Sequence, residues 1–183
     1  MVNVVFVLAP GVHLLDVAGP AQVFSTVGSV GGDEAWNLRY VAETTSVDSH
    51  QGLALKAETD WPALVPADLV VVPGWWIGDH ARVRQPFRSP MLERIAAHHD
   101  AGGEVISVCA GAFALAEAGL LDDRRATTHH DVQEQLAALH PRVRVVRDVL
   151  YVSDDRVHTS AGIASGTDLA LHRVSERLGP HVA

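Results

Sequence analysis

Apolar runs alternate along this chain with segments whose apolar positions recur at helical spacing. Short, almost continuous apolar runs are typical of strands buried on both faces of a parallel sheet. Three such runs occur, at residues 2–8, 68–72 and 104–108. A half-buried strand is predicted at 36–43, where apolar and polar residues alternate, and shorter strands at 143–146 and 150–152, before a turn at Asp154-Asp155.

Helices are predicted between these strands. Proline favours the first turn of a helix, which places one helix from Pro20 to about Thr26 and another from about Ser89 to Asp100. The remaining predicted helices are 110–121, a helix capped by Asp131 and running to Leu139, and one from Ser165 or Thr167 to Leu178. A Gly-rich loop is predicted at 28–34 and a small hairpin at 44–58, bending near Gly52. The order of elements predicts an α/β fold, a flavodoxin-like doubly wound parallel sheet with helices on both faces.

Cys109 stands at the junction between the strand at 104–108 and the helix that follows. A sharp turn there exposes the sulfur, and the helix N-terminus favours the thiolate, so the sequence predicts an accessible thiol with a lowered pKa. The alternative is a small buried apolar residue, which is what most free cysteines are. The small residues Ala110, Gly111 and Ala112 leave space above the sulfur and favour the functional interpretation, with Ala110 and Gly111 lining a ligand pocket.

Asp16 follows the first predicted strand, so it and Cys109 are both expected at the carboxyl edge of the sheet, where ligands bind. A protonated carboxyl there donates a hydrogen bond to a thiolate or carries a proton for a substrate; the alternative is a helix cap. His129 is predicted to reach the same pocket, although a lone histidine is more often structural. Gly74 and Trp75 are predicted to line it; for Trp75 and Trp76, a dimer surface or core packing is the alternative.

The composition and the charge of the chain argue against some binding partners and cofactors. The 183 residues carry 14 Lys and Arg against 22 Asp and Glu, and the densest basic group, Arg82, Arg84 and Arg88, is interrupted by Pro86. Such a chain is predicted not to bind DNA or an anionic membrane by itself. One cysteine, no signal peptide and no run of about 20 apolar residues indicate a cytoplasmic protein. The 11 histidines show no HxxxH or Cys/His spacing, and no GxGxxG is present, so neither a metal site nor a cofactor is expected.

Several motifs resemble a known superfamily. The strand–Cys–helix junction, the acid before GPAQVF and the segment DLVVVPGW resemble the ThiJ/PfpI superfamily, which has the class I glutamine amidotransferase-like fold. SVCAGAFALAEAGLLDDRRATTHH and LYVSDDRVHTSAGIASGTDLALH look most like the sensor domain of AraC-type transcription regulators, and the resemblance covers residues 4–178. It implies one ligand-sensing domain over 1–183 that forms a homodimer and binds an unknown small molecule. DNA contact is then expected only through a C-terminal helix-turn-helix domain that this chain lacks.

The same resemblance supplies a second hypothesis, because the superfamily includes isonitrile hydratases with an early acid and a Cys-Thr pair. Asp16 and Cys109 match the acid and the nucleophile, but Ala110 stands at the position of the threonine and removes a hydroxyl donor. Peptidase-like members carry a histidine at that position, and regulators usually carry tryptophan where this chain has His130. The two hypotheses are a sensor domain without turnover, and a stand-alone hydratase or related hydrolase that uses Cys109 and Asp16.

Overall fold

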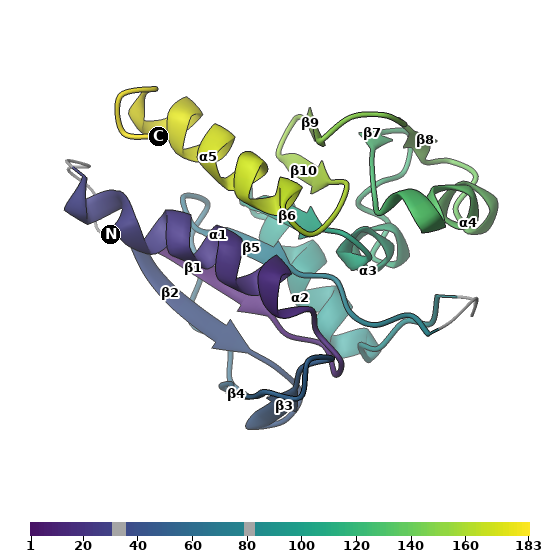
Figure 1. The fold of residues 1–183 in the computed structure, drawn as a ribbon, viewed down its shortest axis with the longest axis horizontal. Coiled ribbons are helices and arrows are strands. Elements are labelled where there is room, and N and C mark those ends of the chain that lie inside the picture. The colour runs from purple at the N-terminus through teal and green to yellow at the C-terminus, as the bar shows by residue number, and fades with distance from the viewer. Residues whose placement is uncertain (31–35, 79–82) are drawn as a thin grey trace.

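A six-stranded sheet forms the centre of the molecule in a computed structural model that describes residues 1–30, 36–78 and 83–183 (Figure 1). Its strand order is β2-β1-β5-β6-β10-β9. The strands are β1 (Val2–Val7), β2 (Trp36–Val41), β5 (Leu69–Val72), β6 (Glu104–Val108), β9 (Tyr151–Asp154) and β10 (Val157–Ser160). All neighbours pair in parallel except β9 and β10, which are antiparallel because a tight turn through Asp155, at a φ of 55°, joins them. The predicted α/β class is confirmed, with one antiparallel edge strand added.

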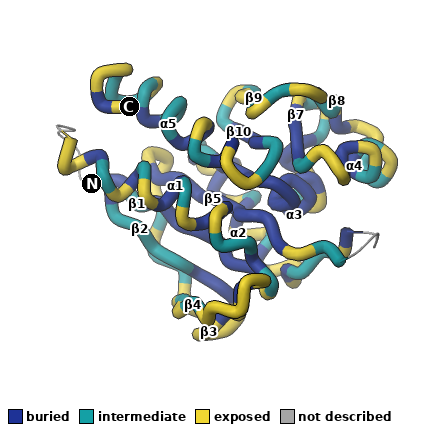
Figure 2. Tube along the Cα trace, in the orientation of Figure 1, coloured by how far each residue is buried: buried dark blue, intermediate teal, exposed yellow. Residues whose placement is uncertain are grey.

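Helices cover both faces of this sheet, as the pattern predicted. α1 (Leu14–Thr26) and α5 (Ser165–Leu178) pack together over one face, whereas α2 (Ser89–Asp100) and α3 (Gly111–Glu117) cover the other. The sheet therefore separates two apolar cores. Alternate residues of β1 enter different cores: Val4 and Phe6 lie on the α1–α5 side, while Val5 and Val7 lie on the α2–α3 side. Burial on both faces (Figure 2) explains why these strands appear as continuous apolar runs in the sequence.

Shorter elements lie outside the central sheet and its four covering helices. The predicted hairpin is present as β3 (Ser46–Asp48) and β4 (Ala54–Lys56), and the bend includes Gly52 at a φ of 82°. The other short elements are η1 (Val27–Ser29), β7 (Arg125–Ala126), η2 (His130–Val132), α4 (Gln133–Leu139) and β8 (Arg144–Val145). The predicted cap at Asp131 is wrong, because Asp131 lies within the 3-10 turn and α4 begins only at Gln133.

The start of α1 also differs from the prediction. The helix begins at Leu14, and Pro20 lies inside it rather than at its first turn. Its first N–H, on Leu14, is satisfied from outside the helix by the Gln51 Oε1 of the β3–β4 hairpin at 3.0 Å. A cap supplied from 37 residues away leaves no local signal in the sequence.

Two predicted features fall partly or wholly outside the described residues: the Gly-rich loop at 28–34 and Arg82 of the most basic segment. Within the described ranges, no helix combines the length and apolar character that crossing a membrane requires.

Candidate functional site

The Cys109 backbone is held in an unusual conformation between β6 and α3. Its φ is 56°, in the left-handed region that residues other than glycine seldom adopt. Both of its peptide groups are fixed: its N–H donates to the Ser160 carbonyl at 3.2 Å, and its carbonyl accepts from the Thr128 hydroxyl at 2.7 Å. A strained conformation persists only where its surroundings hold it, and the two hydrogen bonds from β10 and residue 128 do so.

Two glycines allow the chain segments of the site to approach one another. A Cβ atom at Gly74 would lie 2.7 Å from Asp16 Oδ2 and 2.7 Å from Cys109 Cβ. A Cβ atom at Gly111 would lie 2.0 Å from the Val72 carbonyl oxygen, so α3 begins in direct contact with the end of β5. The structure thus brings together four of the predicted site residues, Asp16, Gly74, Cys109 and Gly111.

The Asp16 side chain is fully buried in the first turn of α1. Its Oδ2 accepts a hydrogen bond from the Gly74 N–H at 3.1 Å, so it does not act as a helix cap. Its Oδ1 has no nitrogen or oxygen partner among the described residues. Burial raises the pKa of Asp16 to about 7, although the N–H groups of Gly74 and Ile163 and the Cys109 side chain act in the opposite direction. At neutral pH the Asp16 carboxyl group is therefore protonated in a large fraction of the molecules.

The predicted accessible, low-pKa thiol is wrong. Cys109 is only 6% exposed, and burial raises the pKa of its thiol. The nearby Asp16 carboxylate raises this pKa further, while the N–H groups of Ala110 and Ile163 lower it by a smaller amount. Helix-end dipoles favour the thiolate, as the sequence indicated, but desolvation and a neighbouring negative charge outweigh them. Near neutrality the pair therefore holds at most one negative charge.

Ile163 completes this site and was not predicted from the sequence. Its N–H lowers the pKa of both Asp16 and Cys109, and its φ is 43°, which is rare for a β-branched residue. The turn that carries it is closed by Ser165, whose hydroxyl accepts from the Gly162 N–H at 2.8 Å. No local sequence signal marks an isoleucine for a left-handed conformation.

Aromatic rings and imidazoles border the site. His13, directly before α1, lies against His50 and Trp76, and His50 stacks on Trp76 with ring centroids 4.2 Å apart. Burial, His50 and His129 together lower the pKa of His13, so its imidazole is neutral at pH 7. The ring of His129, which was predicted to reach the same pocket, packs against Gly162, where a Cβ atom would lie 2.7 Å from its Cδ2. A surface groove lined by residues of 42–43, 59–61, 88–91 and Arg94 shares none of its lining with this site.

Trp75 and Trp76 have different environments. Trp75 is 3% exposed and packs edge-on against Phe87 in the α2–α3 core, so its side chain belongs to the core. Trp76 remains 45% exposed beside His13 and His50. The core alternative therefore holds for Trp75, and Trp76 is the tryptophan that borders the site.

Replacing Gly74 with alanine is expected to lower the free energy of unfolding by about 1–3 kcal/mol, the usual range for overpacking a close contact. The added methyl group overlaps Asp16, Cys109 and the Ala110 nitrogen, which lies 2.9 Å from the ideal Cβ position. Denaturant titration measures the change. Gly28→Ala is the matched control, because a Cβ atom there meets nothing within 4 Å. Equal stabilities of the two variants would contradict the close approach.

Comparisons with known proteins agree with this fold. The family model described as the DJ-1/PfpI family matches residues 2–176. An isonitrile hydratase from Pseudomonas putida is 33% identical over 182 residues, covering 97% of this chain and 73% of that protein. The HTH-type transcriptional regulator CdhR from Pseudomonas aeruginosa is 26% identical, and the match covers 97% of this chain but 51% of the regulator. The crystal structure of an AraC family transcriptional regulator from Pseudomonas putida superimposes with a TM-score of 0.81 at 23% identity, covering 100% of this chain and 95% of that one.

Proposed function

The chain belongs to the DJ-1/PfpI family, and on that premise we propose that it is the ligand-sensing and dimerising domain of an AraC-type transcriptional regulator. The match to CdhR supports this, because this chain aligns over nearly its whole length with about half of a helix-turn-helix regulator. In the proposal, a small molecule binds beside Cys109 in the cytoplasm, and DNA is contacted by a separate C-terminal domain.

The observation that carries the proposal is Ala110. It is 1% exposed at the start of α3, directly beside the thiol, and places a methyl group where the hydratases that this chain resembles have a threonine hydroxyl. The site thus keeps the acid and the sulfur but lacks one hydrogen-bonding group for chemistry at a bound molecule. This favours binding without turnover.

The position of α5 supports a signalling role for the site. Ile163, whose N–H interacts with Asp16 and Cys109, lies two residues before α5, and α5 runs from there to Leu178 near the end of this chain. In the proposal, a ligand that contacts the pair also contacts the turn that starts this helix. In the proposal, displacement of α5 changes how the following domain is presented to DNA. Trp76, exposed at the surface, is available to the homodimer, whereas Trp75 is not.

Isonitrile hydration is the second candidate function. The 33% identity to the Pseudomonas putida hydratase extends over nearly the whole chain, and the Asp16–Cys109 pair is present. A buried carboxyl group with a pKa of about 7 is suited to proton transfer at neutral pH.

Turnover of isonitriles separates these two functions. Because Ala110 supplies no hydroxyl, the purified chain is expected to hydrate simple alkyl isonitriles far more slowly than about 1 per second, an ordinary enzymatic rate. Formation of the N-substituted formamide is measured by chromatography, and Cys109→Ala gives the background. Ala110→Thr is expected to raise the rate above that background. Hydration by the unmodified chain at 1 per second or faster would overturn the sensor proposal in favour of the enzyme.

A further inference from the structure

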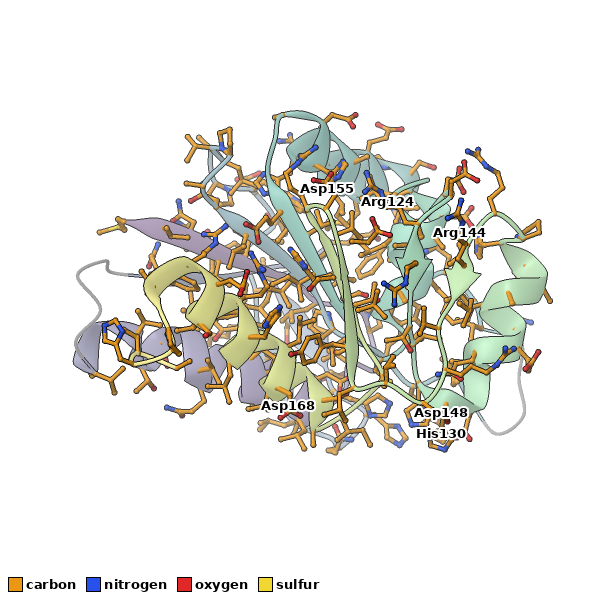
Figure 3. All side chains as sticks on the ribbon, turned by 90° about the horizontal axis from the view of Figure 1, so that it is seen from above. Arg124, His130, Arg144, Asp148, Asp155 and Asp168 are labelled. Atoms are coloured by element: carbon orange, nitrogen blue, oxygen red, sulfur yellow. The ribbon has the colours of Figure 1, made fainter. Side chains whose placement is uncertain are left out.

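Three consecutive residues beside the site bring two imidazoles and a carboxylate together. His130 Nε2 lies 3.0 Å from Asp131 Oδ1, and His129 Nδ1 lies 3.6 Å from Asp131 Oδ2. One potential ligand atom from each residue lies within 4.8 Å of the other two. The group is at the start of η2, and Figure 3 shows His130 at the edge of the molecule.

These separations match those of a metal-ligand set. Zn²⁺ bonds of 2.0–2.2 Å in a tetrahedral arrangement place neighbouring ligand atoms about 3.3 Å apart. The observed nitrogen–oxygen distances are 3.0 Å to one oxygen of the Asp131 carboxylate and 3.6 Å to the other, on either side of that value, and one atom from each residue lies within 4.8 Å of the other two. Imidazole and carboxylate together suit divalent first-row metals, and zinc accepts three protein ligands with one position open. We propose that His129, His130 and Asp131 bind a divalent transition-metal ion, with Zn²⁺ as the best fit.

The first ligand of this site is already positioned by the fold. The His129 ring packs against Gly162, where a Cβ atom would lie 2.7 Å from its Cδ2. His130 and Asp131 are 78% and 68% exposed, so an ion from solvent reaches them without a rearrangement of the core. A metal ion on His129 Nδ1 displaces only the long hydrogen bond, 3.3 Å, that the Asp131 N–H donates to it.

The site is adjacent to the Cys109–Asp16 pair but separate from it. Gly162, against which His129 packs, precedes Ile163, whose N–H interacts with Cys109 and Asp16. A bound ion therefore places positive charge at the border of the candidate site without using the thiol as a ligand. No metal site was predicted because the histidines show no HxxxH or Cys/His spacing, and neither pattern describes ligands on consecutive residues. Ligands on consecutive residues converge only through the geometry of a turn.

The proposal is tested by titrating Zn²⁺ alone into the full chain in an isothermal calorimeter at neutral pH. One ion per chain is expected to bind in the micromolar range, and His130→Gln and Asp131→Asn should each weaken binding at least about tenfold. Cys109→Ser should leave the affinity unchanged. His181→Gln is the matched control, because His181 is an exposed histidine near the C-terminal end.

Two spectroscopic and thermodynamic outcomes would overturn this inference. The first is an affinity for Zn²⁺ that is the same in His130→Gln and Asp131→Asn as in the unmodified chain, or no binding at all. The second is a Co²⁺ complex whose spectrum shows a thiolate charge-transfer band, since this would make Cys109 the ligand. A Co²⁺ complex without that band, lost in both variants, supports the site. The result is independent of the sensor proposal, because turnover of isonitriles is not measured.

Discussion

Replacing Glu104 with glutamine is expected to lower the free energy of unfolding by about 3 kcal/mol, the cost of breaking a buried ion pair. Glu104, at the start of β6, accepts from the Arg173 guanidinium at 2.9 Å and lies 3.0 Å from Arg177 Nη2. His158 Nε2 is 3.3 Å from the same carboxylate. The two arginine side chains are only 11% and 17% exposed, so loss of the carboxylate leaves their charges partly desolvated and unpaired. These contacts attach α5 to the sheet.

The same variant should change how stability depends on pH. Burial favours the protonated form of Glu104, but His158, Arg177 and Arg173 outweigh burial and lower its pKa to about 2 from a usual 4.5. A carboxyl group with a lowered pKa stabilises the fold above pH 4.5, and this contribution is lost as the pH falls from 4.5 towards 2. The difference in unfolding free energy between the unmodified chain and Glu104→Gln is therefore expected to shrink across that window.

Urea titrations at several pH values measure this difference. Glu58→Gln is the matched control, because Glu58 also pairs with an arginine, Arg39, but at the exposed surface, where ion pairs contribute little. Subtracting one curve from another cancels the contribution of buried histidines that do not contact Glu104, such as His99, whose pKa is lowered by burial in both proteins. The contribution of His158 does not cancel, because Glu104 raises the pKa of His158 against the effect of burial and Glu104→Gln removes that interaction. A Glu104→Gln variant as stable as Glu58→Gln at pH 7 would show that the cluster does not hold α5 in place.

The central strands and the helices that cover them were predicted well from the sequence, because they depend on the local pattern of apolar and polar residues. β6 has the predicted bounds, since an apolar run between two glycines and a cysteine permits little else. The start of α1 was missed because its first N–H is satisfied by Gln51 of a distant hairpin. The same limit applies to Trp75 and Trp76, whose burial is decided by Phe87 and His50, residues that no local pattern connects to them.

For the candidate site, the sequence identified which residues meet but not their protonation. Strand ends predicted that Asp16 and Cys109 converge at one edge of the sheet, and they do. The predicted direction of the pKa shift of the Cys109 thiol was wrong, because desolvation depends on the three-dimensional packing around the sulfur. The Thr128 hydroxyl holds the Cys109 carbonyl and the Ile163 N–H lowers the pKa of the thiol, and neither residue type indicates such a role in the sequence.

Replacing Asp16 with asparagine is expected to increase the rate of Cys109 alkylation at pH 8–9 by about tenfold or more, since one pKa unit changes the thiolate population tenfold. The Asp16 pKa of about 7 means that its carboxylate is mostly ionised at this pH, and that charge raises the pKa of the adjacent thiol. Asparagine removes the charge and keeps the size of the side chain. The N–H groups of Ala110 and Ile163, which favour the thiolate, then act without opposition from a neighbouring anion.

The measurement is the rate of iodoacetamide modification of the native chain from pH 6 to 10, followed by mass spectrometry. Cys109 is the only cysteine, so a single adduct reports on it, and its burial affects both proteins alike and cancels in the ratio of rates. Asp168→Asn is the matched control, because Asp168 also lies in the first turn of a helix, α5, but is exposed. The rate of Cys109 alkylation in this variant should stay within about twofold of the rate in the unmodified chain. In the unmodified chain, ionisation of Asp16 as the pH passes 7 holds the thiol protonated, so the rate should rise only at higher pH than in Asp16→Asn. A slower Asp16→Asn variant would mean the reverse assignment, in which Asp16 keeps the proton and stabilises a thiolate on Cys109 by donating a hydrogen bond to it.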